Sequence, residues 1–309
     1  MVRRILVLLL VLILCFGAVG CSGEESSSDS SSTESPSETS SVAGVDTSSK
    51  ESLKEMYMEA LKKSEVFKQY DADDWRSHAY DYKLIALTFD DGPVFSVADD
   101  NNVTQRIVDI LVENDGRGTF FFTGRSLKQN GFALPQYALD NGFEVANHSY
   151  NHASLKEADY ETAVFEIVGV NDLYVENIGV APKYFRGGGF TTGTNMWKVL
   201  GEQDMIAIAS LRGGSGDHAG GSATVDGLVT RLSPEKVSDG EIVCMHSTNK
   251  TGVTPDALAV VLPRLYAEGY RFCTLSELFA FKGVDLKDVP RGEYIKKVEI
   301  GDNGMVIFN

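Results

Sequence analysis

The order of apolar and polar positions separates an N-terminal apolar segment and a polar segment from a longer body. Within the body, short apolar runs alternate with segments whose apolar residues recur every three or four positions. The runs predict strands at 84–89, 119–122, 143–147, 184–186, 205–209, 241–245 and 270–274. The segments with helical spacing predict helices at 51–69, 103–111, 157–176, 195–200, 254–268 and 275–281.

Alternation of strands with helices predicts parallel strands joined by crossover helices. About seven such units fall between residues 83 and 282, which favours an α/β fold of the (β/α) barrel type. In parallel sheets and barrels, active sites lie at the carboxyl ends of the strands. The turn residues 301–304, between apolar segments 294–300 and 305–308, predict a C-terminal β-hairpin outside the core.

The N-terminal segment has the layout of an export signal. A basic start is followed by twelve apolar residues, 5–16, which is short for a transmembrane helix and typical of a signal-peptide core. Small residues then lead to Cys21, as in bacterial lipoproteins, in which such a cysteine is lipidated. A plain secretion signal or an uncleaved anchor is the alternative. The lipoprotein interpretation implies an extracytoplasmic body anchored to the membrane through Cys21.

The polar segment after Cys21 has the composition of a flexible tether. Thirteen of residues 22–50 are serine, and large apolar side chains are almost absent. Such a segment cannot bury enough surface to offset the entropy cost of ordering. We divide the chain accordingly into a signal peptide (1–20), a lipidated cysteine and linker (21–50), a helical extension (51–82), a catalytic domain (83–282) and a C-terminal extension (283–309).

Composition and charge narrow the class of protein. Hydrophobic residues make up 43% of the chain, which is enough for a sizeable core and excludes a wholly disordered protein. The net charge of −16 argues against nucleic acid as a partner and against anionic lipid heads, since both require positive charge. Four cysteines are too few for a disulfide scaffold, and nothing in the sequence indicates a protein partner.

Histidines and carboxylates gather at the predicted strand ends. His148 and His152 are four residues apart, a spacing that places two imidazoles on one side of a helical turn, within reach of one metal ion. Asp90 and Asp91 follow the first strand, where a metal would relieve the repulsion between adjacent carboxylates. One aspartate would bind the metal and the other would act as general base. Surface histidines and an ordinary Asp-Gly-Pro turn are the alternatives.

Three motifs together resemble a known family. They are TFDDGP at 88–93, TFF at 119–121 and HSYNH at 148–152. In this combination they resemble the polysaccharide deacetylases of carbohydrate esterase family 4, which share the NodB homology domain. The segment 269–278 is similar to the closing strand and helix of that domain. The resemblance covers residues 83–282 and implies a distorted (β/α) barrel with fewer than eight strands.

The resemblance also implies roles for individual residues. Asp91, His148 and His152 match the family's ligands for a divalent metal, for which zinc or cobalt is expected. Asp90 matches the catalytic base, and His246 matches the general acid.

Two further residues are implied as supports for the acid and the base. Arg186 matches the arginine that steadies the base. Asp217 matches an aspartate that pairs with Arg186 and supports His246, and a solvated residue in a glycine-rich loop is the alternative for Asp217.

Three motifs depart from the family pattern. The third motif, usually Arg-Pro-Pro-Tyr, is here 186–190, RGGGF, which predicts a floppier loop with a backbone N–H near Gly189 available to the oxyanion. His218 stands where the fourth motif has a tryptophan. Cys244 replaces a leucine that lines the acetyl-methyl pocket. These changes concern sugar preference more than reaction type.

Two functions from different classes follow. The first is a metal-dependent hydrolase that removes N-acetyl or O-acetyl groups from a polysaccharide, with cell-envelope peptidoglycan or a chitin-like glycan as the leading substrate. The second is a membrane-tethered glycan-binding protein on an inactive deacetylase fold, an interpretation supported by the altered third and fourth motifs. All predicted metal ligands, the base and the acid are present, which favours the hydrolase.

Overall fold

The computed structural model describes residues 49–94, 102–218, 223–248 and 253–309. Its centre is a seven-stranded sheet in which every pair of strands is parallel. The strands run in the order β5-β4-β3-β2-β1-β6, and β7 also pairs with β1. Their bounds are β1 (Lys83–Asp91), β2 (Thr119–Phe122), β3 (Glu144–Asn147), β4 (Tyr184–Phe185), β5 (Ile206–Ala207), β6 (Glu241–His246) and β7 (Tyr270–Cys273). The predicted barrel-type α/β fold with about seven strands is confirmed.

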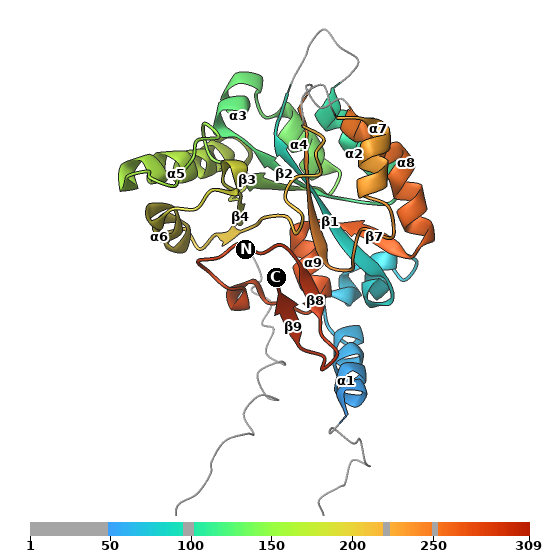
Figure 1. Ribbon diagram of the computed structural model, residues 1–309. Coiled ribbons are helices and arrows are strands. Elements are labelled where there is room, and N and C mark those ends of the chain that lie inside the picture. The colour runs from blue at the N-terminus through green and yellow to red at the C-terminus, as the bar shows by residue number, and fades with distance from the viewer. Residues whose placement is uncertain (1–48, 95–101, 219–222, 249–252) are drawn as a thin grey trace, which may run out of the picture. The chain divides into compact units, whose positions relative to one another are not determined.

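Helices lie around the outside of the curled sheet. Figure 1 shows α2, α7 and α8 on the right of the sheet and α5 and α6 on the left. The bounds of the α-helices are α1 (Lys50–Lys62), α2 (Val103–Glu113), α3 (Gly124–Asn130), α4 (Ala133–Asp140), α5 (Tyr160–Ile178), α6 (Thr194–Glu202), α7 (Val225–Arg231), α8 (Val253–Ala267) and α9 (Leu275–Phe281). The short helices α3, α4 and α7 were not predicted from the sequence.

The predicted helix over 51–69 is wrong in its second half. Helix α1 ends at Lys62, and Phe67–Gln69 forms a separate 3₁₀ turn. Leu61 and Phe67 are both buried in the same cluster. Six residues of helix rotate the side-chain direction by about 240°, so a continuous helix could not turn both residues toward that cluster.

The core is divided by the sheet, and β1 contributes to both of its faces. Ile85, Leu87 and Phe89 pack into the cluster that also contains residues of α2 and α8. Leu84 and Ala86 point to the opposite face and pack with residues of α9. Both faces of the strand are therefore buried, as expected for a parallel sheet covered by helices.

Most residues of the C-terminal hairpin are partly buried or exposed, as predicted, but the segment that leads into it reaches the core. The hairpin itself is present, with β8 (Val298–Ile300) antiparallel to β9 (Val306–Phe308). Ile295 and Val298 are almost completely buried. On one side Ile295 forms a parallel bridge with Ile208, directly after β5. On the other side the residues after Ile295 bond to β6 and to the residue before it, through Ile242 N–H to Lys296 O and Val298 N–H to Gly240 O.

This segment therefore closes the gap between the two edge strands β5 and β6. Edge strands present unpaired backbone groups, and a covering strand or loop satisfies them. We call residues 294–298 the closing segment. It brings Tyr294 into the body of the barrel, close to the ends of β4 and β5.

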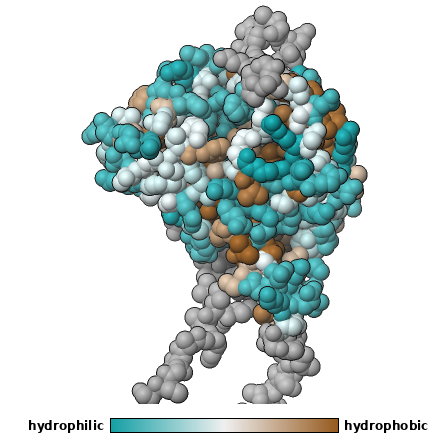
Figure 2. Space-filling model, viewed as in Figure 1, coloured by the Kyte–Doolittle hydropathy of each residue, from teal (hydrophilic) through white to brown (hydrophobic). Residues whose placement is uncertain are grey.

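The face shown in Figure 2 is mainly hydrophilic, and its hydrophobic residues form separate small patches. Among the residues that the structure describes, no helix is both long and apolar enough to cross a membrane. The predicted signal peptide, Cys21 and nearly all of the predicted linker lie outside the described residues. Their assignment stays a prediction.

Candidate active site

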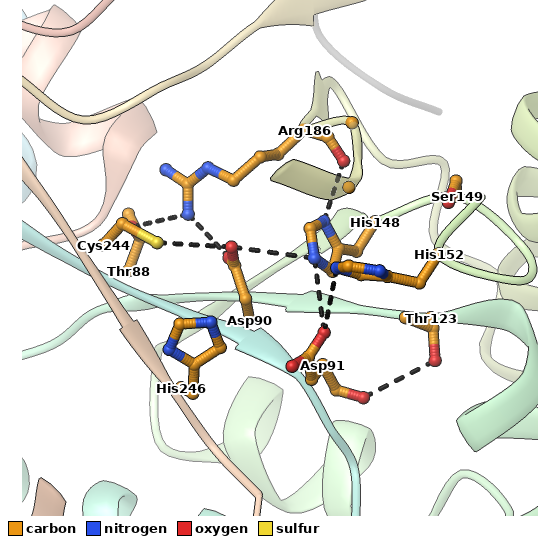
Figure 3. A network of polar contacts seen from close by, with 12 residues as sticks. Thr88, Asp90, Asp91, Thr123, His148, Ser149, His152, Arg186, Cys244 and His246 are labelled. Atoms are coloured by element: carbon orange, nitrogen blue, oxygen red, sulfur yellow. Dashed lines mark hydrogen bonds and ion pairs between the residues drawn. The ribbon is translucent and has the colours of Figure 1, made fainter. Parts of the chain in front are cut away.

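The parallel register of the sheet brings the predicted site residues to one edge. Asp90 of β1 is the register partner of His246 of β6. Asn147, the last residue of β3, pairs with the last residue of β4. His148 and Arg186 therefore leave adjacent strands at the same level. Figure 3 shows Asp90 between His148 on one side and His246 on the other.

The three predicted metal ligands lie together. Asp91 Oδ1 is 3.4 Å from His148 Nε2 and 3.5 Å from His152 Nε2. Ligand bonds of about 2.0–2.2 Å in a tetrahedral site separate neighbouring ligand atoms by about 3.3–3.6 Å. His148 is buried, whereas the His152 side chain is 48% exposed. The three ligand atoms fit one zinc-sized ion, and the His152 side of the cluster is accessible to solvent.

The loop that carries the histidines is not the helical turn that their spacing suggests. Residues 148–152 form no helix, and the two rings are brought to a centroid distance of 4.9 Å by the loop itself. Ser149 and His152 have positive φ angles of 59° and 58°. Such conformations cost about 1–3 kcal/mol each and are concentrated at functional sites. The Ser149 N–H is held by Asn147 Oδ1 at 2.8 Å.

Glu166, which the sequence analysis did not select, holds the other end of this loop. One carboxylate oxygen accepts from the Asn151 N–H at 2.8 Å, and the other accepts from Asn151 Nδ2 at 2.7 Å. Glu166 is buried on α5. Its signal in the sequence is its place within the buried stripe of that helix, between Ala163 and Ile167. A charged residue in an apolar stripe requires a buried polar partner.

The Arg186 carbonyl fixes the orientation of His148. His148 Nδ1 lies 2.8 Å from that oxygen. A carbonyl oxygen can only accept, so Nδ1 carries a hydrogen and Nε2 is the nitrogen that faces Asp91. Metal-binding histidines commonly have such a backbone partner at the second ring nitrogen. This contact supports the fit of the cluster to a metal.

Asp90 is a buried carboxylate with a buried cation beside it. Arg186 donates to Asp90 Oδ1 at 2.6 Å and to Thr88 Oγ1 at 2.9 Å, and its Nε donates to the Ile208 carbonyl. Burial acts to raise the pKa of Asp90. The charges of Arg186, His148 and His246 outweigh burial and hold that pKa below its usual value, so Asp90 is ionised.

The pKa of Asp91 is also below its usual value. Burial acts to raise its pKa, but the hydrogen bond from His148 and the nearby histidine charges lower it to about 2. Asp91 is therefore an anion at any working pH, as a metal ligand must be.

His246 is paired with a carboxylate that is completely buried. His246 Nδ1 is 2.8 Å from Asp217 Oδ1, and the His246 N–H donates to Asp217 Oδ2 at 2.7 Å. Thr254 Oγ1 donates to the same Oδ2. Burial acts to lower the pKa of His246, but the hydrogen bond to Asp217 and the charges of Asp90 and Asp217 raise it above 6.5.

The location of Asp217 decides between the two interpretations of this residue. It is fully buried, so the interpretation of a solvated loop residue is wrong. Its support of His246 agrees with the resemblance, but its pairing with Arg186 does not hold. Within the described part of the chain, the carboxylate that pairs with Arg186 is Asp90.

The glycine-rich loop after Arg186 packs directly on the metal cluster. A Cβ at Gly188 would lie 2.9 Å from the His152 carbonyl and 3.0 Å from its Nδ1, so only glycine fits. The Gly187 N–H donates to the Tyr294 hydroxyl at 3.2 Å. The loop that its composition predicts to be floppy is thus tied to the closing segment. Sequence analysis missed Tyr294, because it lies in a segment predicted to be outside the core.

The other two departures from the family pattern also lie at the site. The His218 ring is 4.4 Å from the His246 ring, tilted by 45°. Asp217, His218 and His246 form a second cluster close enough for a metal, but both oxygens of Asp217 already accept hydrogen bonds. Cys244 is buried with a free thiol that donates to Asp90 Oδ2 at 3.3 Å. Cys273 is likewise buried with a free thiol.

Comparison with known proteins agrees with this geometry. Residues 77–207 match the family described as polysaccharide deacetylase. The chain is 30% identical over 202 residues to a peptidoglycan-N-acetylglucosamine deacetylase of Bacillus cereus, covering 65% of this chain and 90% of that protein. It is 29% identical over 213 residues to a bifunctional xylanase/deacetylase of Pseudobutyrivibrio xylanivorans, covering 69% of this chain. The chain spans only about a third, 32%, of the Pseudobutyrivibrio protein's length.

A solved structure shares the fold. The family 4 acetyl xylan esterase of Clostridium thermocellum, in complex with a cobalt ion, superimposes with a TM-score of 0.59 at 29% identity. The match covers 66% of this chain and 94% of that one. The chain belongs to the polysaccharide deacetylase family, and the resemblance based on its motifs is confirmed.

Proposed function

We propose that this protein is a metal-dependent hydrolase that removes acetyl groups from a glycan of the cell envelope. One observation carries the proposal. At a single sheet edge, Asp90 lies between a three-residue cluster suited to a metal and an imidazole supported by a buried carboxylate. Membership of the deacetylase family supports the same reaction class.

The metal ligands in this proposal are Asp91, His148 and His152. Their separations, and the hydrogen bond that orients His148, fit zinc or cobalt. When bound, the ion supplies Lewis-acid polarisation of an acyl carbonyl and makes water more acidic. The cobalt complex of the Clostridium esterase supports a divalent ion.

The chain's own residues would move the protons. Asp90, ionised and held by Arg186, accepts a proton from the attacking water. His246, kept protonated by Asp217, donates a proton to the departing amine or hydroxyl oxygen. Arg186 fixes the base, and through its carbonyl it also fixes His148, so one residue couples the two parts of the site.

Peptidoglycan leads as the substrate. The Bacillus cereus relative named as a peptidoglycan-N-acetylglucosamine deacetylase is covered over 90% of its length. A signal sequence, a lipidated Cys21 and a serine-rich tether would place the site outside the cytoplasm, beside the cell envelope. Hydrolysis of O-acetyl esters is the second candidate, because the Clostridium structure is that of an acetyl xylan esterase.

The experiment that tests the function is acetate release after metal loading. Purified protein is dialysed with zinc or cobalt and incubated with peptidoglycan, N-acetylated chitooligosaccharides and acetylxylan. We expect bound metal and acetate from at least one N-acetylated glycan. A protein that retains no metal and releases no acetate from any substrate would instead support the glycan-binding protein on an inactive fold.

The anchor needs a separate test. Mass spectrometry of the native N-terminus should find a lipid-modified Cys21. An unmodified N-terminus at another residue would exclude the lipoprotein assignment and leave the catalytic proposal untouched.

A further inference from the structure

The glycine-rich loop after Arg186 contains no proline that would restrict its backbone. The family pattern given above places two prolines after the arginine, whereas this chain has Gly187 and Gly188. Proline restricts φ covalently, and glycine is the least restricted residue. The loop contacts both histidines of the metal cluster, through the Arg186 carbonyl and through Gly188. Its position therefore matters to the site, and something other than its own backbone must fix it.

The contacts that the Tyr294 hydroxyl makes with the loop depend on glycine at position 187. Its hydroxyl accepts from the Gly187 N–H at 3.2 Å and donates to the Thr191 carbonyl at 3.0 Å. A proline at 187 would have no N–H to donate. A Cβ at 187 would also lie 2.9 Å from the hydroxyl oxygen. Glycine at 187 thus provides both the donor and the room for the tyrosine.

The ring of Tyr294 is held as firmly as its hydroxyl. It makes edge contacts with Phe190, at 6.4 Å, and with Trp197 of α6, at 5.5 Å between ring centroids. The next residue, Ile295, is buried, and its backbone N–H and carbonyl bond to Ala207 of β5 and to Ala209 directly after that strand. The hydroxyl is therefore presented from the closing segment of the barrel, and both ends of the loop, Gly187 and Thr191, are tied to one atom.

We propose that Tyr294 is a positioning residue of the active site. Its hydroxyl fixes the loop 187–191 and so replaces the stiffness that prolines would give, which makes the closing segment part of the catalytic unit. The proposal deepens the deacetylase function and rests on it. It also makes a structural claim, protection of the Gly187 amide, that holds whatever the reaction.

A double-mutant cycle separates this role from simple packing. Tyr294→Phe keeps the ring and removes the hydroxyl, leaving the buried Gly187 N–H without its acceptor. We expect kcat on an N-acetylated glycan to fall about 10-fold, because a displaced loop misplaces the histidines that it contacts. KM should change by less than about twofold, because the substrate is not contacted directly.

The effect of Gly187→Pro on kcat should depend on the residue at 294. It should lower kcat when Tyr294 is present and raise kcat in the Tyr294→Phe variant. Gly187 has φ −73° and ψ 145°, angles that proline adopts readily. Gly187→Pro alone should lower kcat, because the ring meets the tyrosine hydroxyl and removes the donor. Gly187→Pro combined with Tyr294→Phe should restore most of the lost kcat, because the contact at 2.9 Å is gone and the loop is stiffened covalently. Losses that multiply in the double variant would overturn the proposal.

Tyr270→Phe is the matched control. Its buried hydroxyl also donates to a backbone carbonyl, that of Val237, but on β7 away from the site residues. It should lower Tm by an amount similar to Tyr294→Phe without changing kcat. Truncation before Tyr294 is unsuitable, because it would also remove the backbone bonds of the closing segment to β5 and β6.

Hydrogen exchange provides the readout that does not depend on the reaction. The amide of Gly187 should exchange faster in Tyr294→Phe and remain unchanged in Tyr270→Phe. If wild-type protein releases no acetate but this difference is found, the proposed deacetylase function is wrong, whereas the role of the Tyr294 hydroxyl in fixing the loop is supported. An unchanged Gly187 amide in Tyr294→Phe, or an unchanged kcat in an active enzyme, would overturn the positioning role.

Discussion

The two sides of Asp90 each contain a carboxylate beside an imidazole, but the two pairs are built for different tasks. On the metal side, the Asp91 side chain is 34% exposed and its Oδ1 is left to face two histidines. On the acid side, the Asp217 side chain is fully buried and both of its oxygens accept hydrogen bonds.

The difference teaches how the same two residue types acquire distinct chemistry. An open carboxylate with a pKa of about 2 is ready to bind a cation. A saturated carboxylate has no capacity for a further ligand, and it acts by raising the pKa of its imidazole. The number of hydrogen bonds that each aspartate already accepts therefore separates the proposed metal ligand from the proposed support for the acid.

The largest expected effect comes from breaking the metal side. His148→Ala removes a buried ligand, so we expect loss of bound metal and acetate release at the background rate. Metal analysis after dialysis and an acetate assay check both results. His78→Ala, a partly buried histidine outside the cluster, is the control and should keep both. Wild-type metal content in His148→Ala would contradict the ligand assignment.

Neutralising the shared base should be nearly as severe, and it should not depend on the substrate. Asp90→Asn keeps the shape of the side chain but cannot take a proton, so turnover should fall by about 10²–10⁴-fold on N-acetyl sugars and aryl acetates alike. Metal content should remain, because Asp91, His148 and His152 are untouched.

The same variant should also lower the free energy of unfolding. Arg186 is fully buried, and Asp90 is its carboxylate partner. Leaving such a charge without its counterion costs about 3–5 kcal/mol, which chemical denaturation would measure. Asp115→Asn, at an exposed partner of Arg76, should cost much less. Full turnover by Asp90→Asn would rule out its role as base.

Breaking the acid side should give a loss that depends on the leaving group. His246→Ala should lower turnover on an N-acetyl sugar by about 10²–10⁴-fold, since an amine needs a proton to depart. An aryl acetate has a good leaving group and should lose far less. Parallel assays on the two substrates measure the ratio. Equal losses would exclude His246 as the acid and leave it a structural role.

The smallest expected effect is a shift in pH dependence. It tests the difference between the two aspartate–histidine pairs most directly. In the proposed mechanism His246 acts when protonated, so the rate should be lost as pH rises through its pKa. Asp217 raises that pKa, and Asp217→Asn should therefore move the alkaline limb of the pH–rate profile to lower pH. Activity near the acidic limb should change much less. An alkaline limb that stays in place would show that Asp217 does not tune the acid.

The metal side could be predicted from the sequence almost completely, and the acid side only in part. Asp90, Asp91 and His148 follow apolar strands, so the rule of strand ends places them together. Asp217 follows no predicted strand, because a glycine-rich loop shows no periodicity. Only the structure reveals that this loop turns inward and buries the carboxylate against His246 and Thr254.

The placement of the closing segment escaped prediction for a physical reason. The apolar pattern of 294–300 indicates a strand but does not say which edge the strand covers. Its partners lie in and directly after β5 and in and directly before β6, far away in sequence, so no local signal reports them. For the same reason Tyr294 gave no sign of its contact with Gly187, although the glycines themselves showed that the loop lacked stiffness.

The closing segment also has a consequence for the order of events during folding. Its bridges to Ile208 and Glu241 join parts of the chain that are remote in sequence, and such pairings form late because chain ends must first meet. The sheet from β1 to β4 can assemble through nearer contacts and bring the histidines and Asp91 together early. Tyr294 reaches Gly187 only when the barrel closes. We expect refolding protein to gain secondary structure before it gains activity, with closure as the step that makes the enzyme competent.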